Sequence, residues 1–258
     1  MKRTFVIGDI HGGFKALLQC IERSGFDKEA DTLISLGDIA DGWPQVPECV
    51  EELLTIRNLI SIRGNHDKWC EDWMFQRIVT ETWADNGGTE TATSYLKVGD
   101  DTIMRHYETF FRKQHLYYKD DQDRVFVHGG FKSRKGIGHE SHLSDYYWDR
   151  DLWTIAMTQH RNEIKTNSPK LTHSTRYRNH KEIYIGHTAT TNWDVKPHYE
   201  EYNDVNQAKN GMITVPMNRC NVWNLDTGGG WGAGKLTIMD IDTKDYWQSD
   251  PVSELYPK

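Results

Sequence analysis

Five short motifs combine glycine with aspartate, histidine or asparagine, side chains that can bind metals and move protons. A single Gly-Asp pair or a lone histidine usually has a structural role. Here each motif follows a short apolar run, and all five occur within one chain, which indicates that they share one site. The motifs are Gly8-Asp9-Ile10-His11-Gly12, Gly37-Asp38-Ile39-Ala40-Asp41, Gly64-Asn65-His66-Asp67, Val127-His128-Gly129-Gly130 and Gly186-His187-Thr188.

The side chains of these motifs predict a site for two metal ions. Asp, His and Asn without Cys form an oxygen and nitrogen ligand set that suits Mn, Fe or Zn. The set exceeds the needs of one ion, and a carboxylate such as Asp38 can join two ions about 3.5–4 Å apart. We expect two divalent ions, with manganese first and iron or zinc as alternatives. The predicted ligands are Asp9, His11 and Asp38 for one ion, and Asp38, Asn65, His128 and His187 for the other.

Two ions held in this way suit the hydrolysis of a phosphate ester. They lower the pKa of a shared water and neutralise the charge of the phosphate, so that a bridging hydroxide can attack in line. The departing alkoxide then needs an acid on the opposite side. His66 can supply the proton because imidazole titrates near neutral pH. Either Asp41 or Asp67 can orient His66 and hold its charge.

The elements that position the motifs alternate along the first third of the chain. Apolar strands are expected at residues 4–7, 32–36 and 59–63. Helices are expected between them, the first with Phe14, Leu17, Leu18 and Ile21 on one face. Alternating strands and helices predict a parallel sheet, and the carboxyl ends of its strands are where a site can form.

The remainder of the chain is expected to carry further short elements around long loops. Residues 68–120 are helical in tendency, and the segment 131–180 is polar and irregular apart from one helix. No repeat, linker or low-complexity tract is evident, so we expect a single domain over residues 1–258. The other predicted elements are a hairpin of 116–119 and 125–128, a helix at 152–164, and strands at 183–185 and 236–241.

Composition limits the class of partner and the compartment. The chain has 258 residues, with 31 basic and 38 acidic side chains and a net charge of −7. This balance makes bulk nucleic acid an unsuitable partner. Scattered cysteines suit a reducing compartment, and no apolar run is long enough for a signal peptide or a membrane span. We expect a cytoplasmic monomer that does not associate with membranes.

A glycine-rich segment near the C-terminus resembles a different motif. Residues 229–235 match most of a phosphate-binding P-loop. However, Leu236 stands where that motif needs the magnesium-binding Ser or Thr, and the segment precedes a strand instead of a helix. We interpret it as a glycine-rich turn packed near the site.

The ordered motifs resemble the calcineurin-like metallophosphoesterases, and within them the phosphoprotein phosphatase branch of phage lambda and bacterial Ser/Thr phosphatases. The likeness runs from Phe5 to about Ile241. It implies an α/β fold, a metallophosphatase-type α/β/β/α sandwich of two mixed sheets with the site at the carboxyl ends of the strands. It supports the metal ligands above, His66 as the acid and Asp41 as its partner. It also implies that phosphate is bound by Arg150, Arg63 and Asn65.

One position departs from the family pattern. The second motif of the family normally continues Asp-Arg-Gly, and its arginine grips phosphate, but here Gly42 stands at that position. Arg63, Lys132 or Arg134 could replace the missing grip. Trp43 could instead offer a stacking face to an aromatic group or a nucleobase.

The function expected from these features is hydrolysis of phosphomonoesters, on phosphoserine or phosphothreonine in proteins or on small phosphate esters. A symmetrical dinucleoside polyphosphate hydrolase, or a phosphoesterase of broad specificity, is an alternative, with Trp43 and the tryptophans of residues 69–83 holding a base. An inactive metal-binding scaffold is a remote alternative, because it should have lost a ligand or the acid, and all are present.

Overall fold

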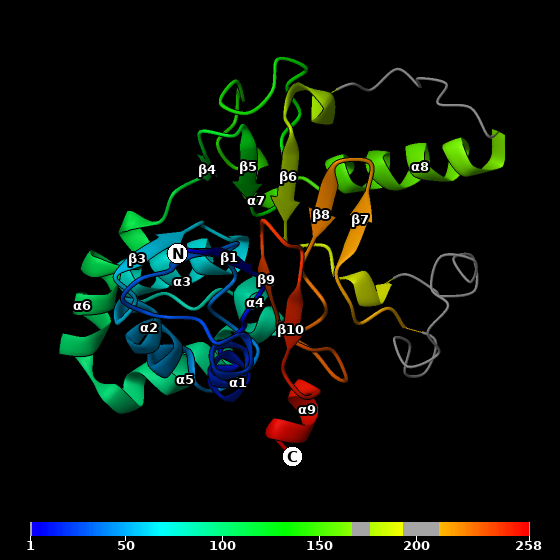
Figure 1. The fold of residues 1–258 in the computed structure, drawn as a ribbon. Coiled ribbons are helices and arrows are strands. Elements are labelled where there is room, and N and C mark those ends of the chain that lie inside the picture. The colour runs from blue at the N-terminus through cyan, green and yellow to red at the C-terminus, as the bar shows by residue number, and fades with distance from the viewer. Residues whose placement is uncertain (1, 167–175, 193–211, 258) are drawn as a thin grey trace.

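The computed structural model describes residues 2–166, 176–192 and 212–257 (Figure 1). Two five-stranded sheets form the centre of the molecule, and helices cover their outer sides. Both sheets mix parallel and antiparallel strands. The predicted α/β/β/α sandwich is therefore confirmed. Part of the irregular segment 131–180, and residues 193–211, lie outside the described residues.

The first sheet has the order β10-β9-β1-β2-β3. Its three parallel strands are in register, with Ile7 beside Ser35 and Ser35 beside Ser61, so their carboxyl ends lie at one edge. On the other side of β1, β9 pairs antiparallel with β1, and β10 pairs antiparallel with β9. The strands are β1 (Thr4–Ile7), β2 (Thr32–Ser35), β3 (Asn58–Ser61), β9 (Thr237–Asp240) and β10 (Tyr246–Gln248).

Helices pack against the outer side of this sheet. Along α1, Leu17 and Cys20 are buried, whereas Leu18 is 40% exposed, so the apolar face is narrower than the sequence predicted. The expected helical tendency of residues 68–120 is realised as several helices, with a kink at Asn86 and Gly87. The elements are α1 (Phe14–Ser24), α2 (Val46–Leu54), α3 (Asn65–Gln76), α4 (Glu81–Trp83), η1 (Ala84–Gly88), α5 (Thr89–Val98), α6 (Asp100–Thr109) and η2 (Phe111–Lys113).

The second sheet has the order β4-β5-β6-β8-β7, with β5, β6 and β8 parallel. Helix α8 packs on β7 and β8 along its outer side (Figure 1). Among the described residues no helix is long and apolar enough to cross a membrane. The elements are β4 (Tyr117–Lys119), β5 (Arg124–Val127), α7 (Asp145–Trp148), α8 (Asp151–Thr166), η3 (Arg176–Asn179), β6 (Glu182–Ile185), η4 (Thr190–Asn192), β7 (Met217–Arg219), β8 (Val222–Asn224) and α9 (Val252–Leu255).

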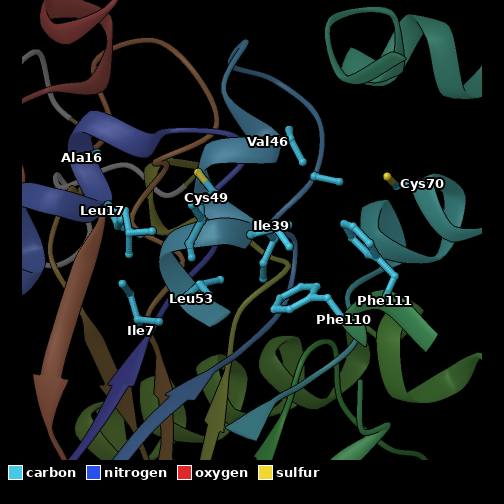
Figure 2. Packing of buried hydrophobic residues seen from close by; sticks show 14 of the residues in the cluster. Ile7, Ala16, Leu17, Ile39, Val46, Cys49, Leu53, Cys70, Phe110 and Phe111 are labelled. Carbon is cyan, nitrogen blue, oxygen red and sulfur yellow. The ribbon is translucent and has the colours of Figure 1, made fainter. Parts of the chain in front are cut away.

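Alternation along the strands separates two kinds of core. Val6 points between the sheets, where Phe126 stacks on Tyr184 with ring centroids 4.8 Å apart. Phe5 and Ile7 point the other way, into the cluster formed with the helices, part of which is shown in Figure 2. Each large apolar side chain buried here contributes about 1.5–3 kcal/mol. These layers hold the strand ends, and thus the polar motifs, in fixed positions.

Candidate active site

The five motifs converge because each follows a strand whose carboxyl end reaches the same region. Asp9 follows β1, Asp38 follows β2 and Asn65 follows β3, while His128 and His187 follow β5 and β6 of the second sheet. Four residues of these loops have left-handed backbone conformations that L side chains adopt rarely. They are His11, Asp38, Asp41 and His187, with φ angles of 50°, 49°, 71° and 66°. Strain of this kind is retained where the surrounding structure fixes a functional geometry.

Asp38 lies at the centre of the site. One group that could hold a metal joins Asp38 to His11 and His66, and a second joins it to His128 and His187. The ligand atoms within each group lie within 4.8 Å of one another. Asp38 therefore belongs to both groups, which is the geometry expected of a carboxylate shared by two ions.

When the ring of His128 is neutral, atoms that can only accept hydrogen bonds converge around its Nε2. Nδ1 of His128 lies 2.8 Å from the carbonyl oxygen of Leu36, so it donates and leaves the lone pair of the neutral ring on Nε2. That nitrogen lies 3.1 Å from Oδ1 of Asn65 and 3.2 Å from Oδ2 of Asp38. In the same way Nδ1 of His11 donates to the carbonyl of Ala40. Such second contacts fix the ring tautomer of metal-binding histidines.

Two further polar atoms in the site are buried without a hydrogen-bond partner. They are Oδ1 of Asp9 and Nε2 of His187. The other carboxylate oxygen of Asp9 accepts a hydrogen bond of 3.0 Å from the backbone N–H of His187, so the two residues are adjacent. Unpaired buried polar atoms are costly unless a ligand satisfies them. Together with the converging acceptors around His128, they show that the residues present fit a pair of cations.

Buried carboxylates raise the negative charge of the site. Burial, followed by repulsion from Asp226 and Asp38, raises the pKa of Asp9 well above its ordinary value. Burial likewise raises the pKa of Asp226 to about 6. Asp226 was not among the residues predicted for the site, although it follows β8 in the same way that the other site residues follow their strands. Divalent cations would relieve this repulsion.

Two of the site histidines have lowered pKa values. Burial, with the neighbouring His66, lowers the pKa of His11 to about 4, and burial lowers that of His187 well below its ordinary value. Both rings are therefore neutral at pH 7, the state that can bind a metal. Burial acts against the charge of Asp38, but attraction to His128 and His66 outweighs it and lowers the pKa of this carboxyl.

His66 is paired with Asp41. Its Nδ1 lies 2.7 Å from Oδ2 of Asp41, which is fully buried, while the His66 ring is 12% exposed. The Asp41 carboxylate also accepts hydrogen bonds from the indole N–H of Trp83 and the hydroxyl of Thr91. Burial lowers the pKa of His66, but the charges of Asp38 and Asp41 outweigh it, so the net shift is upward. Burial raises the pKa of Asp41 to about 6.

Asp67, the other predicted partner of His66, forms its hydrogen bonds with neighbouring loops instead. Its oxygens accept hydrogen bonds from the backbone N–H groups of Ile39, Ala40 and Gly64, and from the side chain of Gln114. This carboxylate ties the loop after β2 to the start of α3. It stabilises the positions of Asp38 and Asn65 and leaves His66 to Asp41.

The arginines proposed to bind phosphate differ in their surroundings. Nη1 of Arg150 donates to the carbonyl oxygen of His187 at 2.6 Å and to Oγ1 of Thr188 at 3.1 Å, and the residue is exposed. Nη2 of Arg63 is instead engaged by Glu71 at 3.2 Å and by the carbonyl of Phe111 at 3.1 Å. Arg150 therefore lies beside the site with room for a ligand, whereas Arg63 is committed to structural contacts.

The position that lacks the family arginine is tightly built. Gly42 has φ = 86°, and a Cβ there would lie 3.2 Å from both the carbonyl oxygen of Gly230 and Cβ of His11. A long side chain in this conformation would be strained. Lys132, considered as a replacement, forms an ion pair of 2.7 Å with Asp145. The local backbone at position 42 therefore disfavours an arginine side chain.

The tryptophans divide into core and site residues. Trp73 and Trp83 are buried in the cluster beneath the helices, so the expectation that the whole segment 69–83 could hold a base is wrong. Trp69 is only partly buried and lies edge-on to His66, with centroids 5.2 Å apart. Trp148, 43% exposed, contacts Trp69 and His187 in the same edge-on manner. On the other side of the site, the ring of Trp231 lies 5.8 Å from His11.

Comparisons with known proteins agree with this geometry. The chain is 34% identical over 87 residues to the serine/threonine-protein phosphatase 1 of Salmonella typhimurium, covering 34% of this chain and 39% of that protein. It is 21% identical over 306 residues to the symmetrical bis(5'-nucleosyl)-tetraphosphatase of Pseudomonas entomophila, covering 99% and 96%. A protein serine/threonine phosphatase of Saccharomyces cerevisiae has a similar fold, with a TM-score of 0.54, 14% identity, and 96% and 80% of the chains covered. The sequence profile of the calcineurin-like phosphoesterases matches residues 2–204. The chain therefore belongs to the calcineurin-like phosphoesterase family.

Proposed function

We propose that this protein is a metal-dependent phosphomonoesterase that removes phosphate from phosphoserine or phosphothreonine. The observation that carries the proposal is the His66–Asp41 pair beside the shared carboxylate of Asp38. A serine alkoxide is a strong base and leaves readily only when an acid protonates it. Symmetrical cleavage of a dinucleoside tetraphosphate instead expels a nucleoside diphosphate, whose phosphate oxygen is a much weaker base and has less need of that proton.

The proposed binding roles follow the positions of the side chains. Asp9, His11 and Asp38 would hold one ion, and Asp38, Asn65, His128 and His187 would hold the other, with manganese expected. When bound, two such ions activate water as the nucleophile and neutralise phosphate charge. Asn65 and the exposed guanidinium of Arg150 would orient the phosphate, because a planar guanidinium can bind two phosphate oxygens at once.

His66 and Asp41 would supply the proton that the leaving oxygen takes up. Asp41 holds Nδ1 of His66 and favours the charged ring, so Nε2 carries the proton that the leaving oxygen needs. Trp83 and Thr91 keep the Asp41 carboxylate in place. The structure also groups His66 with His11 and Asp38 as atoms that could hold a metal. The contact with buried Asp41 favours the acid role, because a charged imidazole cannot bind a metal.

A symmetrical dinucleoside tetraphosphatase is the second candidate. The Pseudomonas entomophila protein named for this activity aligns with nearly the whole chain, although at lower identity than the phosphatase relative. Both candidates would use the same metal site. They differ in the leaving group and in the groups that must be held around the phosphate.

A comparison of kcat/KM for two substrates tests the proposal. Purified protein with manganese should release phosphate from a phosphoserine peptide with a higher kcat/KM than it cleaves diadenosine tetraphosphate. Metal analysis of the same preparation should find about two ions per chain. Faster cleavage of the dinucleotide would replace the proposal by the second candidate. No hydrolysis of either substrate, or of p-nitrophenyl phosphate, would favour a scaffold without activity.

A further inference from the structure

A cavity of about 470 Å³ opens beside the candidate active site on the side of His11. Its walls come from the kinked segment η1, the start of α5, the loop 230–232 and the C-terminal helix region. The volume lies in the range of pockets that hold small organic groups. The residues that matter for its chemistry are Trp43, Asp85, Glu90, Trp231 and Tyr256.

The cavity shares part of its wall with the site. Gly230 lies against the His11 ring, since a Cβ on this glycine would be 2.4 Å from Cδ2 of His11. Trp231 lines the cavity and also contacts His11, while Gly42 lines it where the related family pattern has an arginine. A substrate whose phosphate occupies the metal site can therefore extend a neighbouring group into the cavity. Because Gly42 has no side chain, nothing from this residue fills the cavity where it adjoins the site.

Aromatic rings form much of the lining. Trp43 stacks on Tyr256 with centroids 5.1 Å apart, and Trp231 is 54% exposed. The polar ends of the stacked pair are already used, because Trp43 donates to the carbonyl of Gly229 and Tyr256 donates to Gln45. The faces of the stacked pair are largely taken by each other, so the exposed π surface of the lining is mainly that of Trp231, and such a surface attracts cations.

The charged groups at the cavity are two carboxylates. Asp85 and Glu90 are exposed, and within the described part of the chain neither has an ion-pair or hydrogen-bond partner. One cation lies close by, Lys15, whose Nζ sits 4.8 Å from the centre of the Tyr256 ring and donates to the carbonyl of Leu255. This contact places a cation on the Tyr256 ring. The carboxylates leave the cavity itself with negative charge.

We propose that this cavity is a specificity subsite for a basic side chain, arginine or lysine, near the phosphorylated residue of a protein substrate. The inference rests on the phosphomonoesterase function proposed above and names its substrate class. A cation would gain from both the carboxylates and the aromatic rings, whereas a neutral nucleobase would use only the rings. Charge complementarity thus favours a basic phosphopeptide over a nucleotide.

The test compares phosphoserine peptides that differ in one residue. A single arginine is moved through the nearby positions on either side of the phosphoserine in an otherwise neutral peptide, and kcat/KM is divided by that of the alanine peptide. The best arginine position should give a ratio of about five- to tenfold, as expected when exposed carboxylates and an exposed aromatic ring act together on one cation. In the double variant Asp85→Asn, Glu90→Gln the ratio should fall to about one. The matched variant Glu22→Gln, Asp101→Asn removes two exposed carboxylates elsewhere and should keep the wild-type ratio.

Each other outcome has a definite meaning. Equal rates on the arginine and alanine peptides would overturn the subsite while leaving phosphomonoesterase activity in place. An arginine preference that survives the double variant would also overturn it. Hydrolysis of p-nitrophenyl phosphate but of no phosphopeptide would refute the proposed substrate class and the subsite together. A preference for diadenosine tetraphosphate that is lost in Trp231→Ala, and kept in the double variant, would assign the cavity to a base.

Discussion

At the scale of single residues, the neighbours of His66 are compatible with two different roles. Asp41 holds one ring nitrogen at 2.7 Å, which suits a proton donor. His11 and Asp38 lie close enough that the ring could instead bind a metal. Asparagine keeps a hydrogen-bond donor for Asp41 but cannot act as an acid, so a substitution to it separates these roles.

His66→Asn should therefore act on the leaving group. We expect kcat for a phosphoserine peptide to fall about 100-fold or more, the usual contribution of a general acid. The loss should be much smaller for p-nitrophenyl phosphate, whose leaving group needs little protonation. Steady-state kinetics with both substrates provide the measurement, and metal analysis should still find about two ions. Equal losses on both substrates, accompanied by loss of a metal ion, would make His66 a ligand.

Asp41→Asn should change the pH dependence of the same reaction. The pKa of His66 is raised by Asp38 and Asp41, and burial opposes them. An acid works in its protonated form, so activity declines as pH rises through the pKa of His66. Removing the charge of Asp41 lowers that pKa, and the alkaline limb of the kcat profile should move to lower pH. A limb that stays in place would show that another group sets it.

At the scale of elements, the turn from β3 into α3 places two motifs against each other. Gly64 precedes Asn65 and has an ordinary extended conformation, so its backbone alone does not require glycine. Space does, because a Cβ there would lie 2.0 Å from Oδ1 of Asp38 and 2.3 Å from its backbone nitrogen. The close approach of these two loops brings Asp38 to both metal-binding groups.

Gly64→Ala should consequently disturb the site more than the fold. We expect a loss of about 1–3 kcal/mol in the free energy of unfolding, typical of overpacking, measured by urea with the metal chelated. Turnover should drop at least about tenfold, because a shift of Asp38 misplaces both groups. The control is Gly25→Ala, where φ is 60° and no atom lies within 4 Å of the new Cβ. It should cost about 1–2 kcal/mol from backbone strain and leave turnover intact. Wild-type turnover in Gly64→Ala would contradict the close-approach argument.

Local patterns predicted most elements that carry the site and missed the shortest strands. The apolar runs before Asp9 and Asp38 are β1 and β2, since buried parallel strands leave a continuous apolar signal. The run before Asn65 is β3, which is half-buried at the edge of the sheet. Strands β7, β8 and β10 have only three residues each, too few to show a period of two. β7 and β10 form short hairpins with β8 and β9, and only β8 also pairs with a distant strand, β6. The second sheet of the sandwich was expected from the family resemblance instead of from periodicity.

The same distinction applies inside the site. Residue type and strand-end position were enough to bring together Asp38, His128 and His187. Nothing local indicates that Trp83 would bury its ring and donate to Asp41, because that contact joins residues 42 positions apart. Likewise, the commitment of Arg63 to Glu71 depends on how α3 lies beside β3. Tertiary contacts decide which of several plausible side chains reaches the ligand.

At the scale of the whole molecule, the buried charges of the site set the stability of the metal-free protein. Asp9 has a raised pKa in the folded state, so folding retains a proton that the unfolded chain releases. Its contribution to stability is therefore present at low pH and declines as pH rises above the ordinary range of aspartate. Burial acts to lower the pKa of His128, but the charge of Asp38 outweighs it, so this pKa is also raised. This ring must therefore lose its proton before it can bind a metal.

Added manganese should thus stabilise the protein more strongly at higher pH. Protons compete with the metal for Asp9 and His128, and raising the pH from about 5.5 to about 7.5 weakens that competition. At a hundredfold excess over Kd, binding adds about 2.7 kcal/mol, which raises Tm by about 5–10 °C for a chain of this length. Thermal melts of chelator-treated protein, with and without manganese at both pH values, provide the measurement. Asp38→Asn should lose most of the rise, while Asp101→Asn, on the exposed side of α6, should keep it. A rise that is equal at both pH values would mean that protons and metal do not share these ligands.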